Sequence, residues 1–173
     1  MKRLNRRVLH YSACLILAAA VAAWPSAGWS RTAKHSCNVN TLVPRLLQNW
    51  ANQLKESWST NNPELIVRTY AENGVLLPTC DNGPLTGRAA IRGYFEEFLK
   101  LEPVATFNMA TTRIGGDCPH PFASGLYTFN LGKDGTLQAR YTYVFRQTSP
   151  SAWLIAQHHS SLQPKPASTC PSH

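Results

Sequence analysis

The spacing of hydrophobic residues changes along the chain from a helical period to a strand period. Between residues 41 and 57, hydrophobic side chains recur every three or four positions, which predicts a long amphipathic helix. Residues 63–71 repeat this pattern over a shorter stretch, and a third helix is expected to begin at Gly87 and end before Pro103. Residues 75–77 predict a brief strand, followed by a turn at residues 81–84.

From residue 105 onward, hydrophobic and polar residues alternate, which is typical of half-buried strands. Four strands are expected, at residues 105–114, 122–131, 137–147 and 153–161, with Gly-rich turns at residues 115–117 and 132–135. Consecutive strands joined by short turns form an antiparallel meander. Helices first and strands second indicate an α+β domain, in which the helices cover one face of a curved sheet.

The first thirty residues have the organisation of a secretory signal peptide. Basic residues occupy positions 2, 3, 6 and 7, an uncharged apolar run covers residues 12–23, and small residues follow. That run is well short of the ~20 residues that a transmembrane helix needs. Residues 1–30 are therefore expected to be removed, which predicts a secreted or periplasmic protein that has no membrane association after signal removal.

Removal of this segment lowers the charge of the chain. The 173 residues carry 17 basic and nine acidic side chains, a net charge of +8. Residues 1–30 hold four of the basic and none of the acidic residues, so residues 31–173 carry +4. The remaining basic residues are scattered, and a nucleic-acid partner is therefore not expected. The mature chain divides into an N-terminal segment at residues 31–40, one domain at residues 41–164, and an irregular tail at residues 165–173 that Cys170 ties down.

Four cysteines remain outside the signal segment, namely Cys37, Cys80, Cys118 and Cys170. An even number of cysteines in an exported chain predicts two disulfides, and three pairings are open at this point. The cysteines form no CxxC pair and no Cys/His cluster, so a metal site is not expected. The chain also lacks a Gly-rich dinucleotide-binding loop, and no cofactor is expected.

Three stretches of the sequence resemble a known family. Residues 70–78 read YAENGVLLP, residues 86–91 read TGRAAI, and residues 153–161 read WLIAQHHSS. They resemble the nuclear transport factor 2-like superfamily in its SnoaL-like branch, and specifically bacterial proteins similar to the association domain of calcium/calmodulin-dependent protein kinase II. The resemblance covers residues 41–164 and includes no kinase motif.

This resemblance implies a cone-shaped α+β fold of the nuclear transport factor 2-like type. A curved, mostly antiparallel sheet would pack on three helices and enclose a pocket, and the sheet face would form a homodimer. The start of the first helix would then lie near the turn that carries Cys118, while the ends of the first and last strands would share the opposite rim. The pairings implied are Cys37 with Cys118 and Cys80 with Cys170.

Six strand residues are candidates for lining the implied pocket: Tyr127, Arg140, Tyr143, His158, His159 and Ser160. Adjacent strand residues point to opposite faces, so only one of the two histidines can face inward without a bulge. Tyrosine hydroxyls on an apolar wall suit a small-molecule pocket, and Arg140 is the only nearby strand arginine that could bind an anion. The aspartates all fall in expected turns, which leaves no candidate carboxylate base inside the pocket.

The leading hypothesis is an exported small-molecule-binding domain that forms a homodimer and has no demonstrable catalytic activity. An alternative is a cofactor-free enzyme, an isomerase, dehydratase or cyclase, that uses a pocket histidine with a tyrosine. A second alternative is a structural oligomerisation module, which a filled interior and a large apolar sheet interface would favour.

Overall fold

Helices come first and strands second in the computed structural model, which describes residues 37–79 and 81–164. The elements in chain order are α1 (Val39–Ser59), α2 (Glu64–Val67), β1 (Tyr70–Leu77), β2 (Leu85–Thr86), α3 (Gly87–Phe98), the 3-10 turn η1 (Leu99–Leu101), β3 (Val104–Gly116), β4 (Pro121–Asn130), the 3-10 turn η2 (Gly132–Asp134), β5 (Thr136–Ser149) and β6 (Ala152–Leu162). The expected α+β class is confirmed. The expected signal at residues 1–30 and the tail at residues 165–173 lie outside the described residues.

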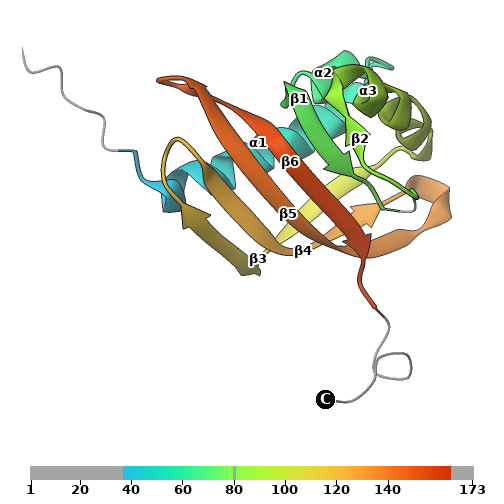
Figure 1. Ribbon diagram of the computed structural model, residues 1–173. Helices are drawn as coiled ribbons and strands as arrows, with labels where there is room; N and C mark the ends of the chain where they lie inside the picture. Colours follow the sequence, from blue (N-terminus) through green and yellow to red (C-terminus); the bar gives the residue numbers. More distant parts are fainter. Residues whose placement is uncertain (1–36, 80, 165–173) are drawn as a thin grey trace, which may run out of the picture. The chain divides into compact units, whose positions relative to one another are not determined.

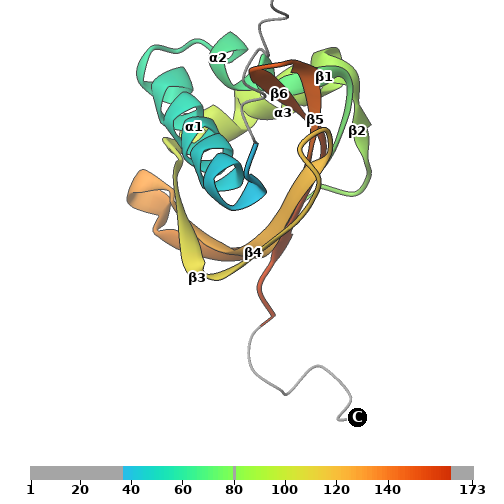
Figure 2. The ribbon, with the colours of Figure 1, turned by 90° about the vertical axis from the view of Figure 1, so that its left-hand side faces the viewer.

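One six-stranded sheet runs in the order β2-β1-β6-β5-β4-β3. The four strands β3 to β6 form the expected antiparallel meander, and β1 pairs parallel to β6. The sheet curves around α1, which lies on its concave side (Figures 1 and 2). No helix within residues 37–79 and 81–164 is long and apolar enough to cross a membrane.

The second helix is shorter than its hydrophobic pattern predicts. Residues 63–71 were expected to be helical, but α2 ends at Val67 and β1 begins at Tyr70. This segment is hydrogen-bonded to the backbone of β6, because the amide of Ile155 donates to the carbonyl oxygen of Thr69 at 2.9 Å. Nε of Arg88 also donates to the carbonyl oxygen of Tyr70 at 2.9 Å. Pairing with a distant strand therefore overrides the local helical period.

Helix α1 buries one face in the curve of the sheet. Its side chains Val43, Leu47, Trp50 and Leu54 are each at most 2% exposed. These positions are three or four residues apart, which places them on one face of a helix. The ring of Trp50 packs edge-on against aromatic rings from β3, β4 and β5, and the helix thereby closes the concave side of the sheet.

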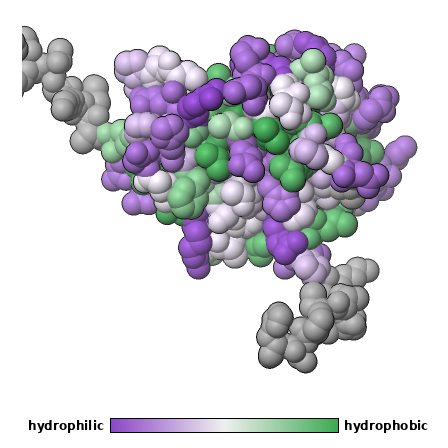
Figure 3. Space-filling model, viewed as in Figure 1, coloured by the Kyte–Doolittle hydropathy of each residue, from purple (hydrophilic) through white to green (hydrophobic). Residues whose placement is uncertain are grey.

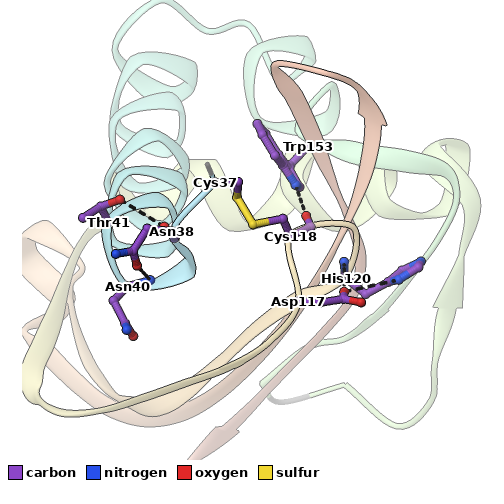
Figure 4. Close-up of a disulfide and its surroundings, with 8 residues drawn as sticks. All are labelled: Cys37, Asn38, Asn40, Thr41, Asp117, Cys118, His120 and Trp153. Atoms are coloured by element: carbon purple, nitrogen blue, oxygen red, sulfur yellow. Dashed lines mark hydrogen bonds and ion pairs between the residues drawn. A yellow bond between two sulfur atoms is a disulfide. The ribbon is translucent and has the colours of Figure 1, made fainter. Parts of the chain in front are cut away.

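A disulfide joins Cys37, just before α1, to Cys118 in the β3–β4 turn, with 6.0 Å between the Cα atoms (Figure 4). The structure thus has the first of the two implied pairings. Nε1 of Trp153 donates to the carbonyl oxygen of Cys118 at 2.6 Å, so β6 also holds this turn. The second pairing, Cys80 with Cys170, lies outside the described residues.

Candidate functional site

Four of the six candidate residues lie on the inner face of the sheet. His158 and Ser160 are two positions apart on β6 and share that face, and they are 3% and 7% exposed. Tyr143 on β5 pairs with His158, and Tyr127 projects inward from β4. The fold therefore brings Tyr127, Tyr143, His158 and Ser160 together on one face of the sheet.

The other two candidates lie on the outer face. Arg140 is exposed between the buried residues Ala139 and Tyr141, so its side chain does not reach the interior. His159 is also exposed and borders a shallow surface pocket with Pro78 and Ser161. Strand alternation turns Arg140 outward, so it does not line the interior as a pocket candidate would. Of the two histidines, the register shift between Val144 and Phe145 leaves His158 on the inner face and His159 on the outer one.

His158 is held by hydrogen bonds at both ring nitrogens. The Tyr70 hydroxyl lies 2.8 Å from Nδ1, and the Tyr127 hydroxyl lies 3.5 Å from Nε2. The imidazole stacks on the ring of Tyr143 with 4.0 Å between the centroids. Nε1 of Trp50 donates to the Tyr70 hydroxyl at 3.2 Å, which extends the polar network to α1.

Burial keeps this cluster neutral. Loss of solvation, with a smaller contribution from the charge of His159, lowers the pKa of His158 to about 3. Burial also raises the pKa of Tyr70, Tyr127 and Tyr143 well above that of a free phenol. At neutral pH the inner face therefore presents hydroxyl groups and an uncharged imidazole. The Tyr143 hydroxyl has no hydrogen-bond partner among the described residues.

The low pKa of His158 predicts acid destabilisation. Between pH 3 and pH 6.5 the histidine binds a proton in the unfolded chain but not in the folded one, so stability falls as the pH is lowered through this window. One proton corresponds to ~1.4 kcal/mol per pH unit, or about 2 kcal/mol between pH 6.5 and pH 5. Urea unfolding at several pH values in this range gives the free energy of unfolding of the wild type and of His158→Gln. This free energy should fall more steeply with decreasing pH in the wild type. Equal slopes would contradict the assignment.

The larger cavity does not lie beside His158 but at the end of the sheet where the β4–β5 hairpin faces α3. The inner space around His158 and Ser160 has a free volume of only about 10 Å³. A larger cavity of about 590 Å³ opens between α3, η1 and the β4–β5 hairpin. Tyr94, Phe98 and Phe129 border both spaces and separate them. Side chains fill the deep interior, and the cavity at the mouth, here called the mouth pocket, is the accessible part.

The wall of the mouth pocket is mainly apolar. Its lining residues are Thr79, Asp81, Leu85, Ala90, Gly93, Tyr94, Glu97, Phe98, Leu101, Phe129, Leu131 and Leu137. Among the residues that the structure describes, no lysine, arginine or histidine belongs to the lining. The Glu97 carboxylate accepts two hydrogen bonds from Nζ of Lys100, each 2.7 Å long. The Asp81 carboxylate accepts one from the Asn82 amide at 2.6 Å.

Thr79 connects the mouth pocket to the buried cluster. It lies two residues beyond the end of β1, and its hydroxyl is hydrogen-bonded to the hydroxyl of Ser160. The Tyr127 hydroxyl donates to the same Ser160 oxygen at 2.5 Å. A continuous polar path therefore runs from His158 to the mouth.

Sequence reasoning missed Trp50, Tyr70, Thr79, Asp81 and Glu97. Asp81 lies in the expected turn at residues 81–84 and Glu97 in the expected third helix, but neither was a pocket candidate. Only the folded chain shows that they border a cavity, because their partners come from α3 and from the distant β4–β5 hairpin. The position of Thr79 at the end of β1 was the available signal, since strand ends often carry binding residues.

The geometry suits binding better than chemistry at His158. Both imidazole nitrogens face tyrosine hydroxyls, and the space beside the ring is smaller than a small-molecule substrate. Within residues 37–79 and 81–164, no three His, Cys, Asp or Glu side chains gather in a way that could hold a metal ion.

Comparisons with known proteins identify the family. The calcium/calmodulin-dependent protein kinase II association domain family matches residues 45–164. A crystal structure from Xanthomonas campestris, described as an association domain of this kind, is 36% identical, covers 76% of this chain and 92% of its own, and has a TM-score of 0.65. No curated protein matches the sequence.

More distant structures share the fold. A nuclear transport factor 2-like protein with a cystatin-like fold from Novosphingobium aromaticivorans is 11% identical, covers 72% of this chain and 81% of its own, and has a TM-score of 0.56. A structure from Catenulispora acidiphila in complex with S-DNPA is 18% identical, covers 70% of this chain and 94% of its own, and also has a TM-score of 0.56. The chain therefore has a fold of the nuclear transport factor 2-like type and belongs to the calcium/calmodulin-dependent protein kinase II association domain family.

Proposed function

We propose that this chain is a small-molecule-binding domain whose ligand occupies the mouth pocket. One observation carries the proposal: a mainly apolar cavity of about 590 Å³ with a few polar groups at defined positions. Small-molecule pockets have volumes of roughly 300–1,000 Å³ and combine an apolar wall with such groups. Thr79, Asp81 and Glu97 supply the polar groups here.

The proposed activity is binding without catalysis. An enzyme that used His158 would need a substrate within hydrogen-bond reach of an imidazole nitrogen. Tyr70 and Tyr127 occupy both positions, and Tyr94 and Phe98 stand between the histidine and the open cavity. Side chains fill the deep interior, but the open mouth pocket favours ligand binding over a purely structural oligomerisation module.

Gly93 offers a way to block the mouth pocket without damage to the fold. It lies on α3 at the pocket wall, and a Cβ at this position would have no atom within 4 Å. Gly93→Phe should therefore fold normally and fill part of the cavity. We expect it to lose at least about tenfold in affinity for the neutral apolar fluorophore N-phenyl-1-naphthylamine, which corresponds to about 1.4 kcal/mol.

Gly93→Ala is the matched control. It adds one methyl group, should keep the affinity within about twofold, and should stabilise the helix by about 0.5–1 kcal/mol because alanine replaces a flexible glycine. Fluorescence titration gives the dissociation constants, and thermal unfolding confirms that both variants are folded. Equal binding by Gly93→Phe and the wild type would show that the fluorophore does not occupy the mouth pocket.

We further infer that the mature protein is an exported homodimer. The signal-like residues 1–30 and the cysteine content support export. Apolar side chains on the outer face of the sheet support the dimer: Phe122 is 40% exposed and pairs across the strands with Val144. Figure 3, which views this side of the molecule, shows hydrophobic residues among hydrophilic ones.

Native mass spectrometry of protein recovered from the periplasm of a Gram-negative host tests both inferences. We expect twice the mass of a chain shortened by about 30 residues, a typical signal length. Phe122→Glu should give the monomer, because a charge in an apolar interface is costly. A full-length monomer in the wild type would contradict both inferences.

A further inference from the structure

The polar path from α1 to the mouth pocket has a direction. An indole N–H can only donate, so Nε1 of Trp50 gives its hydrogen to the Tyr70 oxygen at 3.2 Å. The Tyr70 hydroxyl hydrogen then points to its other neighbour, Nδ1 of His158, at 2.8 Å. Nδ1 is thus an acceptor, and the single hydrogen of the neutral imidazole lies on Nε2.

From His158 the same direction continues outward. Nε2–H faces the Tyr127 oxygen at 3.5 Å, and the Tyr127 hydroxyl donates to Ser160 Oγ at 2.5 Å. Either hydroxyl of the Ser160–Thr79 pair can donate. Since Ser160 Oγ already accepts from Tyr127 and Thr79 is its other described partner, we assign the Ser160 hydroxyl as the donor to Oγ1 of Thr79. Hydrogen bonds that run in one direction polarise one another, which favours this orientation along the whole path.

Thr79 is the last residue of this path, and its hydroxyl hydrogen takes part in none of the hydrogen bonds of the path. Among residues 37–79 and 81–164, Ser160 is the only hydrogen-bond partner of the Thr79 hydroxyl, and Thr79 lines both the mouth pocket and the neighbouring pocket beside His159. The buried cluster therefore presents a hydrogen-bond donor to the cavity. A ligand would complement it with an acceptor, such as a carbonyl oxygen.

The charges at the mouth exclude one class of acceptor. Asp81 and Glu97 are the acidic residues among the described residues of the lining. Lys100 pairs with Glu97, which leaves Asp81 without an ion-pair partner among the described residues. A carboxylate ligand would meet like charge and no basic partner, and this arrangement disfavours it.

We propose that the mouth pocket selects uncharged apolar molecules that carry a hydrogen-bond acceptor oxygen, typically a ketone, and that the Thr79 hydroxyl is the donor that recognises this oxygen. This inference rests on the proposed function, because it assigns a ligand class to the same pocket. Thr79 and Ser160 are the residues that determine specificity, and Asp81 rejects anions.

Competition against bound N-phenyl-1-naphthylamine tests the inference with three matched compounds: 2-acetylnaphthalene, 2-ethylnaphthalene and 2-naphthoate. They differ only in whether the naphthyl group carries a ketone, a hydrocarbon or a carboxylate. For the wild type we expect the ketone to bind at least about tenfold more tightly than either of the other two, in line with the loss of one buried hydrogen bond.

Thr79→Val removes the donor and keeps the shape of the side chain. We expect it to abolish the preference for the ketone while 2-ethylnaphthalene binds as it does to the wild type. Ser160→Ala should reduce the preference, and Thr128→Val, which alters a threonine on the outer face of β4, should leave it unchanged. Unchanged binding of N-phenyl-1-naphthylamine shows that each variant is folded.

The outcomes separate the two proposals. If the fluorophore binds but ketone and hydrocarbon compete equally, or if Thr79→Val keeps the preference for the ketone, the inference about Thr79 is wrong. The proposed function, binding of a small molecule in the mouth pocket, is then unaffected. Tightest binding by 2-naphthoate would overturn the assigned ligand class. Absence of any fluorophore binding at the mouth of the wild type would overturn the proposed function itself.

Discussion

Alanine in place of Trp50 is expected to lower the free energy of unfolding by about 4 kcal/mol. Loss of a buried aromatic side chain costs about 3–5 kcal/mol, because both its transfer free energy and its packing contacts disappear. Trp50 is 2% exposed and contacts the rings of Phe107, Phe129 and Tyr143. The variant also removes the donor that fixes the Tyr70 hydroxyl.

Urea unfolding of Trp50→Ala and of Met109→Ala makes the comparison quantitative. Met109 is 48% exposed, and its truncation should cost about 0.5 kcal/mol or less. Because a domain of this size has a total stability of about 5–15 kcal/mol, the Trp50 variant should lose between roughly a quarter and four fifths of it. A loss below about 1.5 kcal/mol would mean that α1 does not depend on this contact.

Removal of the disulfide is expected to cost a similar amount. The bridge between Cys37 and Cys118 spans 81 positions of the sequence, and closing a loop of that length restricts the unfolded chain. The corresponding loss of stability is about 4 kcal/mol if unfolded-state entropy dominates. We expect this loss in the double variant Cys37→Ser with Cys118→Ser, measured by urea unfolding without reductant.

Two controls separate this bridge from the second expected one. Non-reducing peptide mapping of the wild type should join the Cys37 peptide to the Cys118 peptide. Reductant added to the double variant should lower its stability further only if Cys80 and Cys170 are also paired. A Cys37 peptide joined to Cys80, or a double variant as stable as the oxidised wild type, would contradict the structure.

The fold could be predicted from sequence because its determinants are local patterns. The strand period after residue 105 gives the meander, and the helical period of α1 gives its buried face. The end of α2 could not be predicted in this way. Its last residues have a helical hydrophobic pattern, and only the hydrogen bond from Ile155 shows that the chain has already become a strand.

The orientation of the two histidines shows the same limit within one strand. Strict alternation from the buried Ile155 would place His159 inside. The β5–β6 register instead shifts between Val144 and Phe145, so that Val144 faces Gln157 and Phe145 faces Ile155. This bulge moves the alternation by one residue and turns His158 inward. The mouth pocket could not be predicted from the sequence either, because its wall joins α3 to a hairpin more than thirty residues away.

A crystal structure of the mature chain grown with 2-acetylnaphthalene tests the central claim most directly. We expect the naphthyl group in the mouth pocket between Tyr94, Phe98 and Leu137, with its carbonyl oxygen about 3 Å from Oγ1 of Thr79. A mouth pocket filled by side chains, or the compound bound only elsewhere on the surface, would contradict the claim that this cavity is a ligand-binding site.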